Sequence, residues 1–124
     1  MKRSALVFLG CCSVSLIAFG QDAGDATAGK KLAAKWGCTL CHGPDGNGNK
    51  SNAHFRLGDV PRISAQPQPY FLKSMHDYKS GRRSNADHEV IAEQLSEADL
   101  RSLAAWYGSQ IPKAEATYDY DPDR

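Results

Sequence analysis

Apolar residues recur at helical spacing in three separate stretches of the chain. In the first stretch, Ala28, Leu32 and Trp36 repeat every four residues. This period predicts a helix over about residues 28–36, with these three side chains on its inner face. Gly29 lies inside the same stretch, where glycine costs about 1 kcal/mol relative to alanine. Either another helix packs closely against Gly29, or this end of the helix is frayed.

The second apolar stretch predicts a helix over about residues 70–80. Phe71, Met75 and Tyr78 fall at i, i+4 and i+7, so they share one face. A proline stands just before this stretch and Gly81 follows it, which is typical of the two ends of a helix.

The third apolar stretch predicts a helix that begins after Ser96. Asp99, three residues on, can complete a capping box, and Gly108 and Pro112 follow the last turn. The apolar face of this helix consists of Leu100, Leu103, Ala104 and Tyr107. Before it, residues 82–87 predict a charged loop and residues 89–94 a short helical turn. No stretch alternates convincingly as a strand does, so the expected fold class is all-α.

Residues 1–20 have the features of a signal peptide. Two basic residues precede an apolar run over residues 5–19, and Ala18 and Gly20 provide a small-x-small end. The run is short for a membrane span, which needs about 20 apolar residues. We therefore expect export and cleavage near Gly20, with no stable insertion in the membrane afterwards.

The chain has 124 residues, which is enough for one domain, expected over residues 21–112. Cleavage removes Lys2 and Arg3 and leaves 13 basic residues against 14 acidic ones, a net charge of −1. This charge excludes a strongly basic nucleic-acid-binding protein. Residues 113–124 are acidic and contain proline, so we expect a flexible tail.

The chemistry of the chain centres on the motif Cys38-Thr39-Leu40-Cys41-His42. Positions i, i+3 and i+4 of a helical turn share one face, so Cys38, Cys41 and His42 can point at one flat macrocycle. Two cysteines at this spacing, followed directly by histidine, are typical of c-type haem attachment. We expect one haem c, bound covalently through Cys38 and Cys41, with His42 as an axial iron ligand.

Other interpretations of this cysteine pair fit less well. A thioredoxin-like redox pair needs a βαβ context, and none follows. A zinc site needs a second CxxC or a histidine pair at zinc spacing. A disulfide within CxxC closes a very small loop and adds little stability. Covalent haem attachment also agrees with the export signal, because in bacteria it takes place outside the cytoplasm, and the expected location is the periplasm.

The order of these signals resembles the small monohaem class I cytochromes c of the bacterial periplasm. The resemblance spans about residues 28–107. It rests on the CxxCH motif with the glycines after it and on the segments PRISAQ (61–66), YFL (70–72), YKSGRRSN (78–85), IAEQLS (91–96) and LAAWY (103–107).

This resemblance implies a class I cytochrome c fold, in which about three to five short helices wrap around one covalently bound haem. The first and last helices of such proteins cross near a glycine and an aromatic residue, which match Gly29 and Tyr107. The backbone carbonyl of Pro61 matches the acceptor for the second ring proton of the proximal histidine. Arg83 is either a contact for a haem propionate or a solvated surface residue.

The second axial ligand is where the chain departs from these relatives. Their methionine position is occupied by His88, and no methionine follows Met75. His88 is therefore the leading candidate for the distal ligand, which gives bis-histidine coordination. Met75, His54, His76 and an open five-coordinate iron are the alternatives. Met75 lies on an apolar stripe, where methionine more often fills the core.

The expected function is a periplasmic electron carrier that exchanges single electrons with donor and acceptor proteins. It would act as a monomer or as the small electron-entry subunit of a larger oxidoreductase. No general base, nucleophile or second metal site is apparent, so we expect no enzymatic activity. A haem-based gas or redox sensor, or a peroxidase-like enzyme, would need an open or displaceable distal site. A second imidazole in place of a thioether stabilises ferric iron and lowers the reduction potential.

Overall fold

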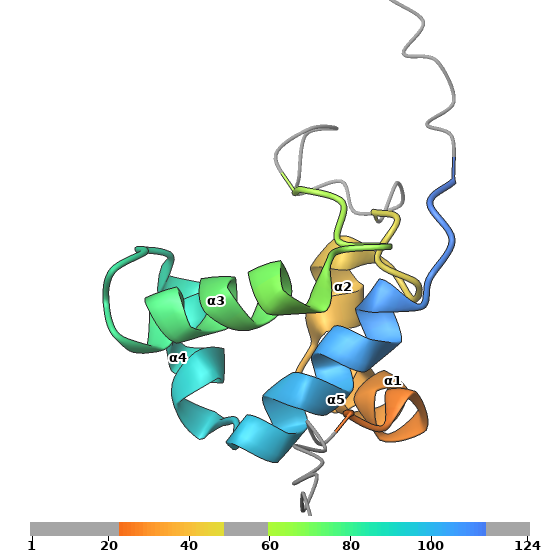
Figure 1. Cartoon of the computed structure of the whole chain (residues 1–124). Coiled ribbons are helices and arrows are strands. Elements are labelled where there is room, and N and C mark those ends of the chain that lie inside the picture. The colour runs from red at the N-terminus through yellow and green to blue at the C-terminus, as the bar shows by residue number, and fades with distance from the viewer. Residues whose placement is uncertain (1–22, 49–59, 114–124) are drawn as a thin grey trace, which may run out of the picture.

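The computed structural model describes residues 23–48 and 60–113 of the chain. These residues form five helices and no strands: α1 (Ala26–Lys35), α2 (Cys38–His42), α3 (Gln68–Lys79), α4 (Ala86–Gln94) and α5 (Glu97–Gly108) (Figure 1). The expected all-α fold class is confirmed. Within the described ranges, no helix is long and apolar enough to cross a membrane. The expected leader over residues 1–20 lies outside them.

Side chains at the helix starts satisfy the free backbone amides there. Asp25 accepts the backbone N–H of Thr27 at 2.8 Å and caps α1. Ser96 and Asp99 form the expected capping box at the start of α5, with each side chain accepting from the other residue's backbone. Such caps typically contribute about 1 kcal/mol each, which matters for helices as short as these, of 10 and 12 residues.

Helix α4 is longer than the apolar pattern predicts. The expected charged loop over residues 82–87 ends at Asn85, whose side chain accepts the backbone N–H of His88 at 3.1 Å. The helix therefore begins at Ala86 rather than at Glu89. Ala92 is the one buried residue of α4, so the helix has almost no apolar period from which its start could be predicted.

Helices α1 and α5 share the most extensive contact between elements, and Gly29 is part of it. A Cβ atom on Gly29 would lie 2.0 Å from the carbonyl oxygen of Ser102 and 2.8 Å from Cβ of Trp106. Close packing therefore explains this glycine, and fraying does not. The prediction that Tyr107 is the aromatic residue at this crossing is wrong. Successive helical residues point about 100° apart, so Trp106 meets Gly29 while Tyr107 points into the core.

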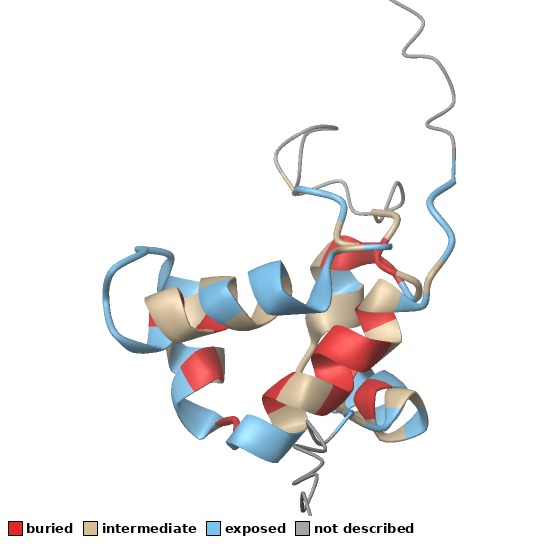
Figure 2. Ribbon diagram, viewed as in Figure 1, coloured by how far each residue is buried: buried red, intermediate tan, exposed pale blue. Residues whose placement is uncertain are grey.

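The inner face of α1 also differs from the prediction. Its buried residues are Gly29 and Ala33, whereas Leu32 and Trp36 are half-buried. Most of the helix is coloured as intermediate or exposed (Figure 2). The backbones of α1 and α5 approach so closely at Gly29 that only small residues fit on the line between them. Leu32 and Trp36 pack at the side of this contact against the edge of the core.

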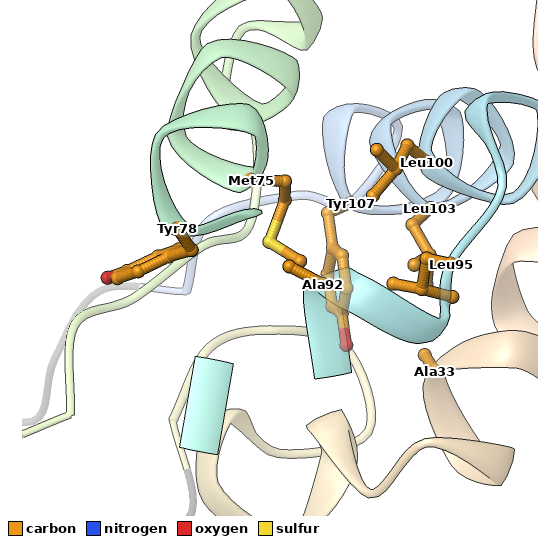
Figure 3. Close-up of a cluster of buried hydrophobic side chains, with 8 residues drawn as sticks. All are labelled: Ala33, Met75, Tyr78, Ala92, Leu95, Leu100, Leu103 and Tyr107. Carbon is orange, nitrogen blue, oxygen red and sulfur yellow. The ribbon is translucent and has the colours of Figure 1, made fainter. Parts of the chain in front are cut away.

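The core lies where α3, α4 and α5 face one another, with Ala33 of α1 at its margin (Figure 3). The predicted apolar faces of α3 and α5 are confirmed. The core side chains are Met75 and Tyr78 from α3, Ala92 and Leu95 from α4 and its end, and Leu100, Leu103 and Tyr107 from α5.

Replacing Gly29 by alanine tests the helix crossing. At an unobstructed helix position this change gains about 1 kcal/mol. Here the added methyl group must displace the Ser102 backbone, so we expect the free energy of unfolding to fall by about 1–3 kcal/mol. Thermal unfolding followed by circular dichroism measures the change. A variant as stable as the original, or more stable, would contradict the close approach.

Candidate functional site

The core opens on one side into a cavity of about 500 Å³. Its walls come from α2, from the segment that precedes α3, and from α3, α4 and α5. The cavity brings together all six site residues expected from the sequence. These are Cys38, Cys41, His42, Pro61, Arg83 and His88.

Helix α2 is a single turn isolated by two glycines. Gly37 before it and Gly43 after it both have positive φ angles, 73° and 77°, which glycine adopts without strain. These two turns let the chain enter and leave the helix abruptly, so the motif side chains Cys38, Cys41 and His42 all line the cavity. Neither cysteine is in a disulfide. Burial raises the pKa of the Cys38 thiol, which keeps it protonated.

His42 is held by the hydrogen bond that the resemblance implies. The side chain is 7% exposed, and its Nδ1 lies 2.8 Å from the carbonyl oxygen of Pro61. A carbonyl can only accept, so Nδ1 carries the ring proton and Nε2 keeps its lone pair. Burial lowers the pKa of His42 and outweighs the opposite effect of the Pro61 carbonyl. The imidazole is therefore neutral and able to bind a metal.

The segment that carries Pro61 is fixed by the loop after α2. The carbonyl oxygen of Gly46 accepts the backbone N–H groups of Ile63 and Ser64 at 2.8 and 3.0 Å. The N–H of Ala65 donates to the carbonyl of Tyr107 at 2.9 Å, so α5 supports the same segment. The position of the His42 acceptor therefore depends on residues from three separate parts of the chain.

Asn47 joins these parts through its side chain. Its Oδ1 accepts from the Ser64 hydroxyl and from the backbone N–H of Lys113, both at 2.8 Å. Its Nδ2 donates to the carbonyl of Ile111 at 3.1 Å. Asn47 was not identified from the sequence. No local signal distinguishes it, because its partners lie far away along the chain.

His88 faces His42 across the cavity. The centroids of the two rings are 6.0 Å apart, and the ring planes are inclined by 70°. When two imidazoles bind opposite sides of one metal ion through bonds of about 2 Å, their ring centres are about 6 Å apart. The separation of His42 and His88 therefore suits one metal ion held between them.

The tautomer of His88 is set by the residue that caps its helix. Asn85 Oδ1 accepts the backbone N–H of His88 and lies 2.8 Å from the ring Nδ1. Since that oxygen can only accept, Nδ1 carries the proton and Nε2 keeps its lone pair, as in His42. Burial is the largest cause that lowers the pKa of His88. Both imidazoles are thus neutral, with the same tautomer.

Tyr78 forms the face on which His88 lies. The two rings are stacked, with centroids 4.7 Å apart and planes inclined by 22°. The guanidinium carbon of Arg83 lies 4.8 Å from the centroid of the same Tyr78 ring, in cation–π geometry. Arg83 is exposed at the edge of the cavity, where it supports Tyr78.

Met75, His76 and His54 are the alternative ligand residues, and the structure describes the first two of them. Met75 also lines the cavity, but it is 8% exposed and packs within the hydrophobic core. His76 is not in the cavity wall, and its Nε2 lies 3.0 Å from a carboxylate oxygen of Glu97. His54 lies outside the described residues. Among the candidates that the structure describes, His88 and Met75 are therefore the ones in the cavity.

The hydroxyl of Tyr107 is a further polar group in the cavity wall. Tyr107 is 1% exposed, and its hydroxyl interacts with the Cys38 thiol. Burial is the main cause that raises its pKa, so the hydroxyl stays protonated and can donate. This polar group thus lies beside the first cysteine of the motif, in the wall of the same cavity.

These features together fit a haem. Two thiols stand at the spacing that covalent attachment needs, and two neutral imidazoles face each other at the separation that suits one iron. The rest of the wall is mostly apolar, as a flat macrocycle requires. Within the described ranges, no group of three or more His, Cys, Asp or Glu residues could hold a metal ion of another kind.

Comparison with known proteins agrees with this site. The family model described as cytochrome c matches residues 26–110. The chain belongs to the cytochrome c family. As a member of the family, it binds haem c covalently through cysteine.

The match covers different shares of the length of two curated cytochromes. Cytochrome c4 of Pseudomonas aeruginosa is 37% identical over 98 residues, which are 79% of this chain and 44% of that protein. Cytochrome c-554(548) of Halomonas halodenitrificans is 33% identical over 92 residues, which are 71% of this chain and 99% of that protein. The chain thus spans about half the length of the cytochromes c4 it matches and nearly all of the shorter cytochrome.

Solved structures share the cytochrome fold. Reduced recombinant cytochrome c4 from Pseudomonas stutzeri superposes with a TM-score of 0.57 and 28% identity, covering 69% of this chain and 48% of that one. A thiosulfate dehydrogenase from Marichromatium purpuratum gives a TM-score of 0.61 and 27% identity, covering 77% of this chain and 21% of that one. The expected class I cytochrome c fold is confirmed.

Replacing Asn47 by alanine tests how the proximal side is held together. The change removes three side-chain hydrogen bonds between separate segments, so we expect the free energy of unfolding to fall by about 1–3 kcal/mol. Lys113→Ala is the matched control. It breaks only the exposed ion pair with Asp45 and keeps the backbone N–H that Asn47 accepts, so we expect a loss of about 0–1 kcal/mol. Equal losses in the two variants would contradict the role of Asn47.

Proposed function

We propose that this cytochrome carries single electrons through one haem c, which is attached to Cys38 and Cys41 and ligated by His42 and His88. The observation that supports this proposal most strongly is the pair of facing imidazoles, whose ring centroids are 6.0 Å apart. Each ring has its Nδ1 proton committed to an oxygen, which leaves both Nε2 atoms free to bind iron.

Haem c, when bound, supplies an iron that alternates between the ferric and ferrous states. The chain fixes the surroundings of that iron. Pro61 holds the ring of His42, and Asn85 and Tyr78 hold the ring of His88. Because neither imidazole has to turn or exchange a proton at Nδ1, the protein reorganises little when the charge changes.

The nature of the distal ligand sets the direction of electron flow. A histidine stabilises ferric iron better than the thioether of a methionine does, so the reduction potential is low relative to methionine-ligated cytochromes. Met75 stays in the core as an apolar side chain. A carrier of this kind accepts electrons from a strong donor and can pass them to an acceptor of low potential.

The proposed setting is the periplasm, reached through the leader over residues 1–20. The partners are donor and acceptor proteins, and we propose neither nucleic-acid binding nor enzymatic activity. A variant of this function is an electron-entry domain within a larger oxidoreductase. The similarity to part of a thiosulfate dehydrogenase supports this variant, because that enzyme contains a region with the same fold.

Replacing His88 by alanine tests the distal ligand. The ferric haem of the original protein should show a low-spin bis-imidazole signal in electron paramagnetic resonance, without a sulfur-to-iron absorption band. We expect His88→Ala to convert the iron to high spin, and its ferrous form to bind carbon monoxide rapidly. His76→Ala is the control and should leave the spectra unchanged, since His76 pairs with Glu97 outside the cavity.

Three results would contradict the proposal in distinguishable ways. An unchanged low-spin spectrum in His88→Ala would exclude His88 as the ligand. A sulfur band in the original protein would indicate Met75 instead. High-spin iron or rapid carbon monoxide binding in the original protein would favour a haem-based sensor with an open or displaceable distal site.

Replacing His88 by methionine tests the effect of the ligand on potential. The thioether favours ferrous iron, so we expect the ratio of ferrous to ferric protein at a given potential to rise at least tenfold, which corresponds to about 59 mV. Spectroelectrochemical titration measures the change. A potential that stays the same or falls would contradict coordination at this position.

A further inference from the structure

We propose that Asn85 is a positioning residue that sets the reduction potential through the Nδ1 proton of His88. This inference rests on the proposed function, in which His88 ligates iron. It adds to that function a residue that does not touch the iron and a physical route by which it acts.

The side-chain oxygen of Asn85 contacts two nitrogens of His88. Asn85 Oδ1 accepts the backbone N–H of His88 at 3.1 Å, which starts α4, and the ring Nδ1 of the same residue lies 2.8 Å away. The backbone N–H of Asn85 in turn donates to Glu89 Oε1 at 2.9 Å. Both the backbone N–H and the side-chain oxygen of Asn85 are therefore bonded to the first turn of α4, and these bonds keep the oxygen next to Nδ1 of His88.

The bond at Nδ1 affects the metal-binding nitrogen on the other side of the ring. An acceptor at Nδ1 fixes the tautomer and makes Nε2 a stronger donor to a metal. A stronger donor stabilises ferric iron more than ferrous iron and lowers the potential. The strength of the acceptor at residue 85 should therefore control the potential in a graded way.

Tyr78 makes it possible to vary this acceptor without moving the ring. Tyr78 lies on a different helix, α3, and its ring stacks on the ring of His88 with the centroids 4.7 Å apart. The guanidinium of Arg83 in turn packs on the Tyr78 ring. The plane of the imidazole is thus supported independently of Asn85. Changes at residue 85 should alter the hydrogen bond at Nδ1 and leave His88 in the cavity.

Two substitutions should move the potential in opposite directions. Asn85→Gly removes the acceptor but keeps a residue that caps helices almost as well, within a few tenths of a kcal/mol. Asn85→Asp keeps the cap and provides a charged, stronger acceptor. Ala86→Asp is the matched control for the added charge, because this neighbouring residue is exposed and its carboxylate is not the cap.

We expect the ferrous-to-ferric ratio at a given potential to rise at least threefold in Asn85→Gly, which corresponds to about 28 mV at 59 mV per tenfold for one electron. In Asn85→Asp we expect it to fall at least threefold below the value for Ala86→Asp. All three variants should remain low-spin. In proton NMR of the ferrous holoprotein, the His88 Nδ1 proton should be protected from exchange in the original protein and exchange rapidly in Asn85→Gly.

The inference is wrong if Asn85→Gly changes only the melting temperature, with the potential and the His88 proton signal unmoved. It is also wrong if Asn85→Asp shifts the potential no further than Ala86→Asp does, because charge alone would then account for the shift. Failure of the proposed function is seen separately, as a ferric spectrum that does not respond to His88→Ala. If that variant loses low-spin iron while the Asn85 variants change nothing, His88 is a ligand and only the role of Asn85 is rejected.

Discussion

Two neutral imidazoles face each other across one cavity, and the rest of the structure keeps them in that position. A separation of 6.0 Å between the rings of His42 and His88 suits one metal ion held between them. Each ring must also present the same nitrogen. Both rings do so because an oxygen occupies Nδ1, the Pro61 carbonyl on one side and the Asn85 amide on the other. Burial keeps both rings uncharged.

The two sides of the cavity reach this result by different physical means. The proximal side is assembled over long distances, since Pro61 is held by the loop after α2, by the end of α5 and by Asn47. On the distal side the hydrogen bond itself is local, since Asn85 and His88 lie at the start of α4, whereas the stacked ring of Tyr78 comes from α3. Loss of tertiary structure should therefore disturb the proximal hydrogen bond first, whereas the distal one can form as soon as the helix starts.

The close crossing of α1 and α5 places these two sides relative to each other. Gly29 removes the side chain that would separate the helices, and Ala33 continues the contact one turn later. The larger residues expected on this face, Leu32 and Trp36, are displaced to its margin. The recurrence of apolar residues every fourth position predicted the helix correctly but not which of its faces is buried. The reason is that close contact between two helix backbones requires small residues, whether or not they are strongly apolar.

The sequence by itself determined the features that depend on neighbours within one turn: the shared face of Cys38, Cys41 and His42, and the cap at Ser96. Only the tertiary structure decided which side chains meet across the cavity. That His88 faces His42, that Asn47 joins three segments and that Trp106 rather than Tyr107 meets Gly29 all depend on how helices pack. Such contacts join residues far apart along the chain, and a shift of one residue in a helix turns a side chain by about 100°.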